Sequence, residues 1–332
     1  MSDWKKRKVT ILGLGRSGIA TALYLANRGA KVFLSDSQEA TPEKISQAND
    51  LQKLGVQVEF GQHSAEAARF GEFIVTSPGI KPETEIMQTA RSLGKEVISD
   101  VELAFRESRA KIIAITGTNG KSTTTALISF ILEKSGRVAP ACGNIGVPIL
   151  SQLDRRPDYL VVEVSSFQLH YTVNLAPFIG VWLNLTPDHL DWHGGLDGYV
   201  ADKQRLFANQ RPDQYAVLNM DDSIVASAKC RSEIFPFSAQ TDLNYAVQGA
   251  FVKDGYLAYR LNGRSRIVCH KNDLKILGQH NIENALAAIS ACALAGVEHS
   301  EIEMYLQEFT ALEHRLEYVA TINGVRYYND SK

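Results

Sequence analysis

A stretch near the middle of the chain, IIAITGTNGKSTTT at 112–125, carries residue types that bind a triphosphate. Gly120, Lys121 and Ser122 match the second half of the phosphate-loop pattern G-x-x-x-x-G-K-[ST]. Ile115 occupies the position of its first glycine. A lysine at this position reaches the β- and γ-phosphates, and the hydroxyl that follows it ligates Mg²⁺. An apolar run precedes the loop and a helix-like run follows it, so we predict a triphosphate site rather than an ordinary glycine-containing turn.

A second glycine-rich loop lies near the N-terminus, where GLGRSG at 13–18 follows the apolar run 8–12. The pattern G-x-G-x-x-G between a strand and a helix lets the backbone approach a diphosphate, which the helix N-terminus stabilises. Asp36 ends the next apolar run, close to the spacing of a ribose-binding carboxylate. The loop predicts a diphosphate site and leaves open NAD, FAD, a UDP-sugar, or a tight turn that binds nothing.

Two further segments carry side chains that could ligate a metal. Glu163 ends the apolar run 159–163, where it could hold Mg²⁺ beside the triphosphate or simply pair with a neighbouring side chain. The segment 184–195 follows another apolar run and contains four potential ligands, Asp188, His189, Asp191 and His193. Their spacing matches no zinc signature, and the turn-forming composition of the segment explains them equally well.

The elements that must position these residues are strands and helices in alternation. Such alternation indicates βαβ units around parallel sheets. The main expected strands are 8–12, 31–36, 72–79, 95–99, 111–116, 159–164, 179–185 and 215–219. Short strands and turn dipeptides between Phe235 and Val268 predict a small antiparallel insert, and 280–296 has the pattern of an amphipathic helix.

The fold class is therefore predicted as α/β, with a Rossmann-like parallel-sheet domain followed by a central P-loop-type α/β domain. The charged stretch 103–111 is the expected boundary, which gives domains over 1–108 and 109–312. Near the C-terminus, Asn323 and Gly324 lie between two β-type runs and predict a tight hairpin.

Composition bounds the class of protein. The 332 residues are 45% hydrophobic and 22% charged, which is ordinary for a globular chain. A net charge of −2 without a basic block gives little support for a nucleic-acid or anionic-membrane partner. No run reaches the roughly 18 apolar residues of a transmembrane helix. The four cysteines are scattered, so we expect reduced thiols and a cytoplasmic location.

Together the two loops and the polar segments resemble the Mur ligase family. Its central domain carries T-G-T-N-G-K-[ST] in place of the standard phosphate loop, as residues 116–122 do here, so Ile115 is a family trait. The resemblance continues through GNIGVP (143–148), EVSSFQL (163–169), PDHLDWH (187–193), YVADKQRLF (199–207), LGQHNIENALAA (277–288) and EHRLEYV (313–319). TSPGI at 76–80, GLGRSG and the terminal NDSK resemble the members that add D-glutamate.

The resemblance implies an ATP-dependent ligase of peptidoglycan precursor synthesis that joins D-glutamate to UDP-N-acetylmuramoyl-L-alanine. A carboxylate and an amine only form a salt in neutral water, so the carboxylate must first be activated. The implied route passes the γ-phosphoryl group of ATP to the alanyl carboxylate, and the amine of D-glutamate then attacks the acyl phosphate. ADP and phosphate leave. The resemblance also implies Mg²⁺ at two sites. We expect a monomer, and from charge and hydropathy no nucleic-acid or membrane partner.

Site residues follow from the resemblance position by position. Lys121, His189 and Lys203 would be catalytic. Ser122 and Glu163 would hold one Mg²⁺, while His189 and a carbamylated Lys203 would hold the second. From the neighbouring residues alone, Lys203 is predicted to be an exposed helix lysine. If it is carbamylated as the resemblance implies, an oxygen ligand replaces an ammonium group that would repel Mg²⁺.

Two larger sets are implied in the same way. The ATP-binding set is Gly117, Thr118, Asn119, Gly120, Lys121, Ser122, Thr123, Asn281, Arg315, Asp330 and Lys332. The set for the UDP-linked substrate is Gly15, Arg16, Ser17, Asp36, Ser37, Ser77, Gly79, Asn144 and His189. In this assignment the N-terminal loop binds UDP and no NAD.

Ligases of this type also carry a C-terminal domain that helps bind D-glutamate and closes over ATP. Residues 313–332 resemble the linker and the start of that domain. We expect the 332 residues alone to bind the UDP-linked substrate weakly or moderately and to show little ligase activity, because acceptor binding and water exclusion are lost.

Other classes explain only part of the pattern. An NAD-dependent oxidoreductase leaves the second loop unexplained, and a nucleotide switch or kinase leaves the first loop unexplained. Another Mur-type ligase is the nearest alternative.

Overall fold

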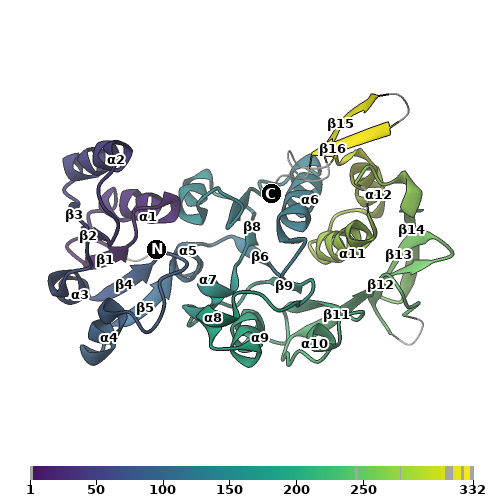
Figure 1. Ribbon diagram of the computed structural model, residues 1–332. Helices are drawn as coiled ribbons and strands as arrows, with labels where there is room; N and C mark the ends of the chain where they lie inside the picture. Colours follow the sequence, from purple (N-terminus) through teal and green to yellow (C-terminus); the bar gives the residue numbers. More distant parts are fainter. Residues whose placement is uncertain (1–2, 244–245, 277, 311–316, 323–324, 330–332) are drawn as a thin grey trace.

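The computed structural model describes residues 3–243, 246–276, 278–310, 317–322 and 325–329. Within these ranges the chain forms two α/β units, each built on its own sheet, which lie side by side in Figure 1. Helix α5 (Asp100–Glu107) joins the last strand of the first sheet to the first strand of the second. The predicted α/β class is confirmed.

The first sheet is entirely parallel, with strand order β3-β2-β1-β4-β5. Its strands are β1 (Lys8–Leu12), β2 (Lys31–Asp36), β3 (Gln57–Phe60), β4 (Phe73–Thr76) and β5 (Glu96–Ser99), connected by helices α1 (Arg16–Ala26), α2 (Pro42–Lys53), α3 (Ala65–Phe70) and α4 (Glu85–Ser92). Chain order reverses between β1 and β4, and ligands bind such sheets at this switch point. The loops that contain Gly13 and Ser77 therefore border the same crevice.

The second sheet has nine strands in the order β14-β13-β12-β11-β10-β9-β6-β8-β7. They are β6 (Lys111–Thr116), β7 (Ala141–Gly143), β8 (Tyr159–Glu163), β9 (Ile179–Trp182), β10 (Tyr215–Asn219), β11 (Glu233–Ser238), β12 (Gly249–Lys253), β13 (Tyr256–Leu261) and β14 (Arg264–His270). Only the pairs β12–β13 and β13–β14 are antiparallel. The antiparallel insert was expected from Phe235, yet β11 pairs parallel with both of its neighbours, so the antiparallel part begins at β12.

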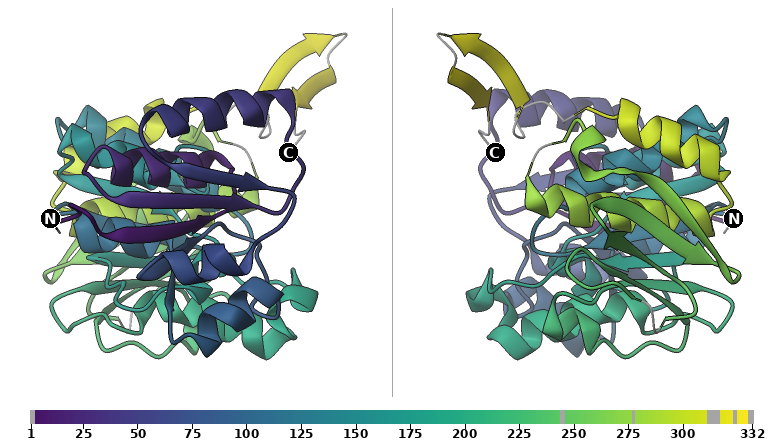
Figure 2. Two further views of the ribbon diagram at one scale, coloured as in Figure 1. Left: turned by 90° about the vertical axis from the view of Figure 1, so that its left-hand side faces the viewer. Right: turned by 90° about the vertical axis from the view of Figure 1, so that its right-hand side faces the viewer.

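Helices cover both faces of each sheet (Figure 2). Those of the second unit are α6 (Lys121–Lys134), η1 (Ile149–Arg155), α7 (Ser166–His170), α8 (Leu190–His193), α9 (Leu196–Gln204), η2 (Arg205–Phe207), α10 (Ser223–Ala226), η3 (Lys271–Asp273), α11 (Gln279–Leu294) and α12 (His299–Glu308). The predicted helix 280–296 is α11. Strands β15 (Glu317–Ile322) and β16 (Val325–Asn329) pair as the predicted hairpin, which projects from the body in Figure 2. Residues 323 and 324 lie outside the described ranges.

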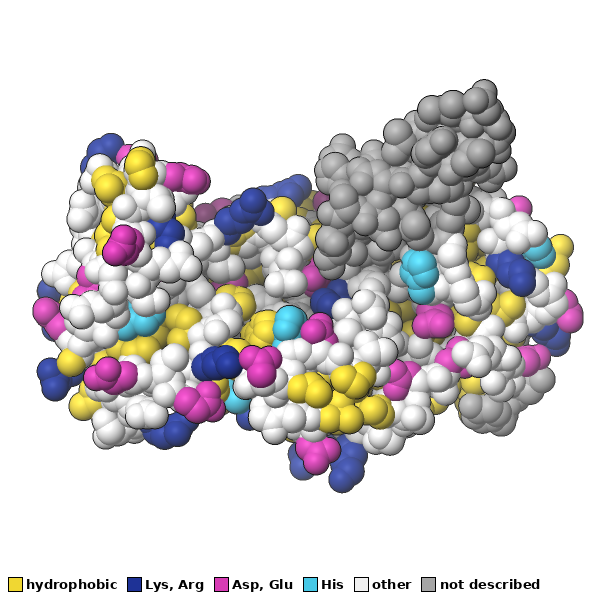
Figure 3. Space-filling view, viewed as in Figure 1, with side chains coloured by type: hydrophobic (Ala, Val, Ile, Leu, Met, Phe, Trp, Pro, Cys, Tyr) yellow, Lys and Arg dark blue, Asp and Glu magenta, His cyan; other side chains and the backbone are white. Residues whose placement is uncertain are grey.

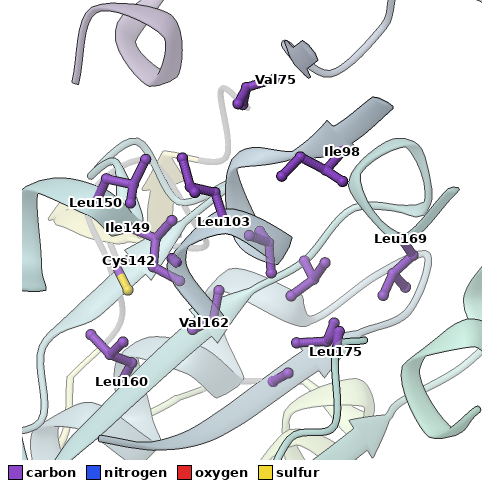
Figure 4. Packing of buried hydrophobic residues seen from close by; sticks show 14 of the residues in the cluster. Val75, Ile98, Leu103, Cys142, Ile149, Leu150, Leu160, Val162, Leu169 and Leu175 are labelled. Carbon is purple, nitrogen blue, oxygen red and sulfur yellow. The ribbon is translucent and has the colours of Figure 1, made fainter. Parts of the chain in front are cut away.

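Strand β6 separates two hydrophobic cores because successive side chains of a strand point to opposite faces. Ile113 and Ile115 pack in the core beneath α6 and α11. Ile112 and Ala114 pack in the other core, which extends without a break into the first unit. Figure 4 shows this shared core, with Val75, Ile98 and Leu103 from the first sheet and α5, and Ile149, Leu150, Leu160 and Val162 from the second unit.

Helix α5 also links the two units through a buried carboxylate. Glu102 is fully buried and accepts the backbone N–H groups of Val173, Asn174 and Leu175 at 3.0 Å. Arg106 donates to the same carboxylate at 2.8 Å. Part of the stretch 103–111, expected as a domain boundary, is thus a packed helix; the boundary itself stays a prediction.

Two composition-based expectations can be compared with the structure. All four cysteines are free thiols. Among the described residues, no helix has both the length and the apolar character needed to cross a bilayer.

Candidate functional site

The loop 117–120 connects β6 to α6 in the strand–loop–helix order predicted for a triphosphate site. Gly120 has a φ of 81°, and a Cβ atom there would collide with Asn284 Oδ1. A side chain is therefore excluded at this turn both by conformation and by space. Ile115, which replaces the first glycine of the standard pattern, lies within β6 with its side chain buried, before the chain bends.

Two lysines meet at the carbonyl oxygen of Gly117. Lys121 Nζ donates to Gly117 O at 3.0 Å and to Thr118 O at 2.8 Å. Lys203 Nζ donates to Gly117 O at 2.9 Å from α9. The two amines thus converge on one oxygen of the phosphate loop.

Lys203 is 1% exposed, so the expectation of an exposed helix lysine is wrong. Burial lowers the pKa of its amine to about 7, with a further contribution from Lys121 that Asp188 opposes. The ammonium loses its hydration in this position, which disfavours the charged form. At neutral pH a large fraction of Lys203 is therefore a neutral amine. Its Nζ also lies 4.7 Å from the centre of the Tyr199 ring.

A buried carboxylate lies next to the first turn of α6. Glu163 is 1% exposed, and its two oxygens accept from Ser122 Oγ at 2.6 Å and from Asn144 Nδ2 at 2.8 Å. Among the described residues Glu163 takes part in no ion pair. A buried carboxylate with only neutral donors, beside a hydroxyl oxygen, is a donor set that fits a hard divalent cation such as Mg²⁺.

These residues meet because their strands are parallel neighbours. In the strand order β9-β6-β8, the loops after all three strands leave the same edge of the sheet. Lys121 and Ser122 follow β6, Glu163 ends β8, and Asn184 follows β9. On the face seen in Figure 3, basic, acidic and histidine side chains gather where the surface is hollowed between the two units.

Asn184 was not among the predicted site residues. Its Oδ1 accepts the N–H groups of Thr118 at 3.1 Å and of Asn119 at 2.9 Å, and its Nδ2 donates to Asn119 O at 3.2 Å. It therefore holds the phosphate loop from the neighbouring strand. The only signal in the sequence was a polar residue directly after the apolar run of β9.

The four potential ligands of the segment 184–195 do not form a metal cluster. No group of three or more His, Cys, Asp or Glu side chains suited to a metal occurs in the described part of the chain. Asp191 pairs with Lys81 at 3.2 Å, and the side chain of His193 is buried. His189 has a φ of 50° at the start of α8, is half exposed, and lies 3.4 Å from Asp188. The structure therefore gives no support for a cluster made by this segment alone, and the metal role of His189 stays a prediction.

A second unpredicted network fixes the helix that carries Lys203. Asp202 lies within 2.7 Å of His193 Nδ1 and 2.9 Å of His170 Nδ1. His193 Nε2 in turn lies 3.0 Å from Ser166 Oγ. Burial lowers the pKa of His193 even though Asp202 favours its charged form. The network connects α7, α8 and α9 around the lysine.

In the N-terminal loop, Asp36 holds the backbone in place. Its carboxylate accepts Leu14 N at 2.9 Å, Gln38 N at 2.8 Å and Lys44 Nζ at 3.0 Å. Burial alone would raise the pKa of Asp36, but these hydrogen bonds lower it below the ordinary range. Gly13 has a φ of 95°, and a Cβ there would lie 2.6 Å from Ser77 Oγ, so the two loops of the switch point touch.

The other residues predicted for the UDP-linked substrate lie around this crevice. Gly15 precedes α1, and Ser37 is exposed after β2. Ser17 lies beside the buried carboxylate of Asp100, whose pKa is raised by burial. Two further residues of this set approach the second unit. A Cβ atom on Gly146 would lie 3.2 Å from Arg16 Nη1, and the carbonyl oxygen of Gly79 accepts from Trp192 Nε1.

At the far side of the phosphate loop, two asparagines of α11 are buried. Asn284 Nδ2 donates to Asn281 Oδ1 at 2.8 Å, and Asn284 Oδ1 accepts from Thr124 at 3.2 Å. This pair ties α11 to α6. Three members of the predicted ATP set, Arg315, Asp330 and Lys332, lie outside the described residues.

Comparisons with known proteins agree with this architecture. The Mur ligase middle domain matches residues 115–292, and the Mur ligase MurD-like N-terminal domain matches residues 7–99. The UDP-N-acetylmuramoylalanine--D-glutamate ligase of Pelotomaculum thermopropionicum is 40% identical over 337 residues, which cover 100% of this chain and 73% of that protein. The enzyme of the same name from Caldanaerobacter subterraneus subsp. tengcongensis is 42% identical, with 99% and 72% covered.

Solved structures show the same fold at lower identity. The UDP-N-acetylmuramate:L-alanyl-gamma-D-glutamyl-meso-diaminopimelate ligase from Neisseria meningitides superposes with a TM-score of 0.63 at 21% identity, over 93% of this chain and 99% of that one. A murein peptide ligase from Psychrobacter arcticus gives 0.61 at 19% identity, over 97% and 72%.

A parallel-sheet unit with a diphosphate-type loop, followed by a phosphate-loop unit with a buried carboxylate, is the architecture of a nucleotide-dependent enzyme. The matched domains and the relatives make the assignment specific: this chain belongs to the Mur ligase family. Mur ligases form amide bonds at the expense of ATP, in the synthesis of peptidoglycan.

Proposed function

We propose that this chain uses ATP to activate the alanyl carboxylate of UDP-N-acetylmuramoyl-L-alanine and joins it to the amino group of D-glutamate. The choice of acceptor rests on relatives at 40% and 42% identity that carry D-glutamate ligase in their names. The observation that carries the nucleotide chemistry is the meeting of Lys121, Ser122, Glu163 and Lys203 around one loop.

In this proposal Lys121 neutralises the charge that develops on the transferring phosphoryl group. The loop 117–120 and the first-turn N–H groups of α6, including those of Ser122 and Thr123, hold the phosphate oxygens. The N–H groups of Thr118 and Asn119 donate to Asn184 Oδ1, and these two hydrogen bonds hold the shape of the loop. Asn281 would contact the nucleotide from α11, and Arg315, Asp330 and Lys332 stay sequence-based assignments.

Ser122 and Glu163 would hold one Mg²⁺, and His189 with a carbamylated Lys203 would hold a second. Bound Mg²⁺ would neutralise phosphate charge and orient the reacting oxygens. Carbamylation joins the neutral amine of Lys203 to CO₂ with loss of one proton, and it converts a cation into an oxygen ligand. The lowered pKa of Lys203, about 7, supports this assignment because only the unprotonated amine reacts.

The UDP-linked substrate would lie across the two units. Gly15, Arg16, Ser17, Ser37, Ser77 and Gly79 would contact its UDP end, and Asn144 and His189 its muramoyl-alanine end. Asp36 has backbone and lysine partners for its carboxylate, so we assign it chiefly to holding the loop. A monomer in the cytoplasm remains the prediction from sequence.

Donor selectivity tests the proposal without requiring turnover. Binding to the chain is measured by calorimetry for UDP-N-acetylmuramic acid, UDP-N-acetylmuramoyl-L-alanine and UDP-N-acetylmuramoyl-L-alanyl-D-glutamate. We expect the alanyl compound to bind most tightly, because it is the donor to which D-glutamate is added. Preference for either of the others would assign the chain to another Mur-type ligase, and binding of NAD alone would overturn the proposal.

A further inference from the structure

The loop after β4 is attached to the second unit at three successive residues. Trp192 Nε1 donates to Gly79 O at 3.2 Å. The Tyr171 hydroxyl donates to Ile80 O at 3.0 Å, and Lys81 pairs with Asp191 at 3.2 Å. These contacts join a loop assigned to the UDP-linked substrate to α7 and α8 of the unit that carries the phosphate loop.

Trp192 is a rigid attachment point. It is 7% exposed and lies among aromatic rings of α7 and of the residue that follows it, with centroid distances of 4.8 Å to Phe167, 5.1 Å to His170 and 6.4 Å to Tyr171. The three rings meet it edge to face, a favourable geometry for aromatic pairs. The indole N–H therefore has a fixed direction.

Gly79, by contrast, has little to fix it locally. Its φ is 97°, a region open to glycine, and nothing lies within 4 Å of the position of a Cβ. A glycine in such a position can rotate its peptide groups at small cost. The hydrogen bond from Trp192 Nε1 therefore restrains the backbone of Gly79, where side-chain packing does not.

We infer that Trp192 is a positioning residue for the UDP-linked substrate: it fixes the Ser77–Gly79 loop from the second unit, and Tyr171 assists at Ile80. The inference rests on the proposed function, in which Ser77 and Gly79 contact the UDP end of the substrate. It also gives α8, which begins directly after His189, a direct contact with the UDP subsite.

Two variants and a matched control test the inference by calorimetry on the whole chain. Trp192→Phe removes the indole N–H, and we expect the Kd for UDP-N-acetylmuramoyl-L-alanine to rise about five- to tenfold, the factor that one hydrogen bond contributes. Tyr171→Phe keeps the ring and should raise the same Kd about two- to fivefold. The Kd for ATP should stay unchanged in both variants.

Trp4→Phe is the control, because it also removes an indole N–H bond, from Trp4 Nε1 to Glu107 at 3.0 Å, at a site away from the loop. It should lower the melting temperature and leave both affinities unchanged. Amide hydrogen exchange of a peptide over 76–82 supplies a readout independent of ligand. Exchange there should accelerate in Trp192→Phe and Tyr171→Phe and stay unchanged in Trp4→Phe.

The outcomes separate the inference from the proposed function. If the parent chain binds the UDP-linked substrate and both aromatic variants bind it equally well, Trp192 has no positioning role and the proposed function stands. If exchange over 76–82 accelerates in the variants but the parent chain does not bind the substrate, the loop is positioned as inferred and the proposed ligand is wrong; the inference about the substrate then falls with it.

Discussion

Burial is the main reason why the amine of Lys203 could react at neutral pH. The side chain lies inside the protein, donates to Gly117 O, and has a pKa of about 7 because its ammonium is removed from water. Below that pH the amine is protonated and inert towards CO₂; above it the amine is neutral. A surface lysine with its ordinary pKa would be almost entirely charged at pH 7.

The first prediction concerns this lysine. With carbon-13 bicarbonate, we expect a carbamate signal in the NMR spectrum of the protein that grows as the pH is raised through about 7, because deprotonation exposes the nucleophilic amine. Lys203→Arg should remove the signal, since a guanidinium does not deprotonate in this range. An equal signal in the arginine variant would mean that another amine is modified.

The second prediction concerns the buried carboxylate. Glu163→Gln keeps the shape of the side chain and removes its charge, so Mg²⁺ loses a ligand. In nucleotide titrations we expect the affinity for ATP with Mg²⁺ to fall about tenfold or more, equivalent to about 1.4 kcal/mol, and the affinity without Mg²⁺ to be retained. Glu72→Gln removes an exposed carboxylate outside the site and should change neither value. An equal loss with and without Mg²⁺ would contradict the metal assignment.

At the scale of elements, parallel strands bring the site together. The loops after β6, β8 and β9 leave the same edge of the sheet. Ser122 and Glu163, 41 positions apart, and Thr118 and Asn184, 66 positions apart, therefore become neighbours only through strand order. Asn184 is the clearest case, since it follows β9 and holds the loop after β6 through the N–H groups of Thr118 and Asn119.

The third prediction tests this loop attachment. Asn184→Ala leaves two N–H groups of the loop without their side-chain acceptor, and we expect the free energy of unfolding to fall by about 1–3 kcal/mol together with the ATP affinity. Asn184→Asp keeps an acceptor oxygen but adds a negative charge near the phosphates. It should preserve stability in urea unfolding and still weaken ATP binding. If the two variants lose stability equally, the acceptor oxygen is not what holds the loop.

At the scale of the whole molecule, the two units share one core. The cluster that contains Val75 and Ile98 continues through Leu103 of α5 to Leu160 and Val162 of the second sheet (Figure 4). The buried Glu102 adds hydrogen bonds across the same junction. Apolar contact of this kind couples the stability of both units, because separating them would expose the shared surface.

The fourth prediction follows from this coupling. The chain has three tryptophans, of which Trp4 lies in the first unit and Trp182 and Trp192 lie in the second. Variants that retain only Trp4 or only Trp182 of the three therefore report each unit separately. We expect both fluorescence signals to change at the same urea concentration, as a cooperative transition requires. Glu102→Gln should lower both midpoints together, since the amide replaces a carboxylate that accepts several N–H groups. Two separated transitions would show that the units unfold independently.

The sequence by itself determined much of the fold and the chemical character of the site. Local patterns sufficed for eight of the main strands, for the helix 280–296 and for both glycine loops, because strand periodicity and glycine turns are properties of a few consecutive residues. The family resemblance named Ser122, Glu163 and Lys203, and the structure brings Ser122 and Glu163 within hydrogen-bonding distance.

Only the tertiary structure decided which side chains support those residues. Three contacts connect elements that only the folded chain brings together: Asn184 with the phosphate loop, Asp202 with His193, and Trp192 with Gly79. The burial of Lys203 likewise depends on how these elements pack. Residues 188–193 looked like a possible metal cluster because they are adjacent in sequence, yet backbone direction sends Asp191 towards Lys81 and His193 into the interior. Proximity along the chain predicts secondary structure, whereas partners across the fold depend on strand order and packing.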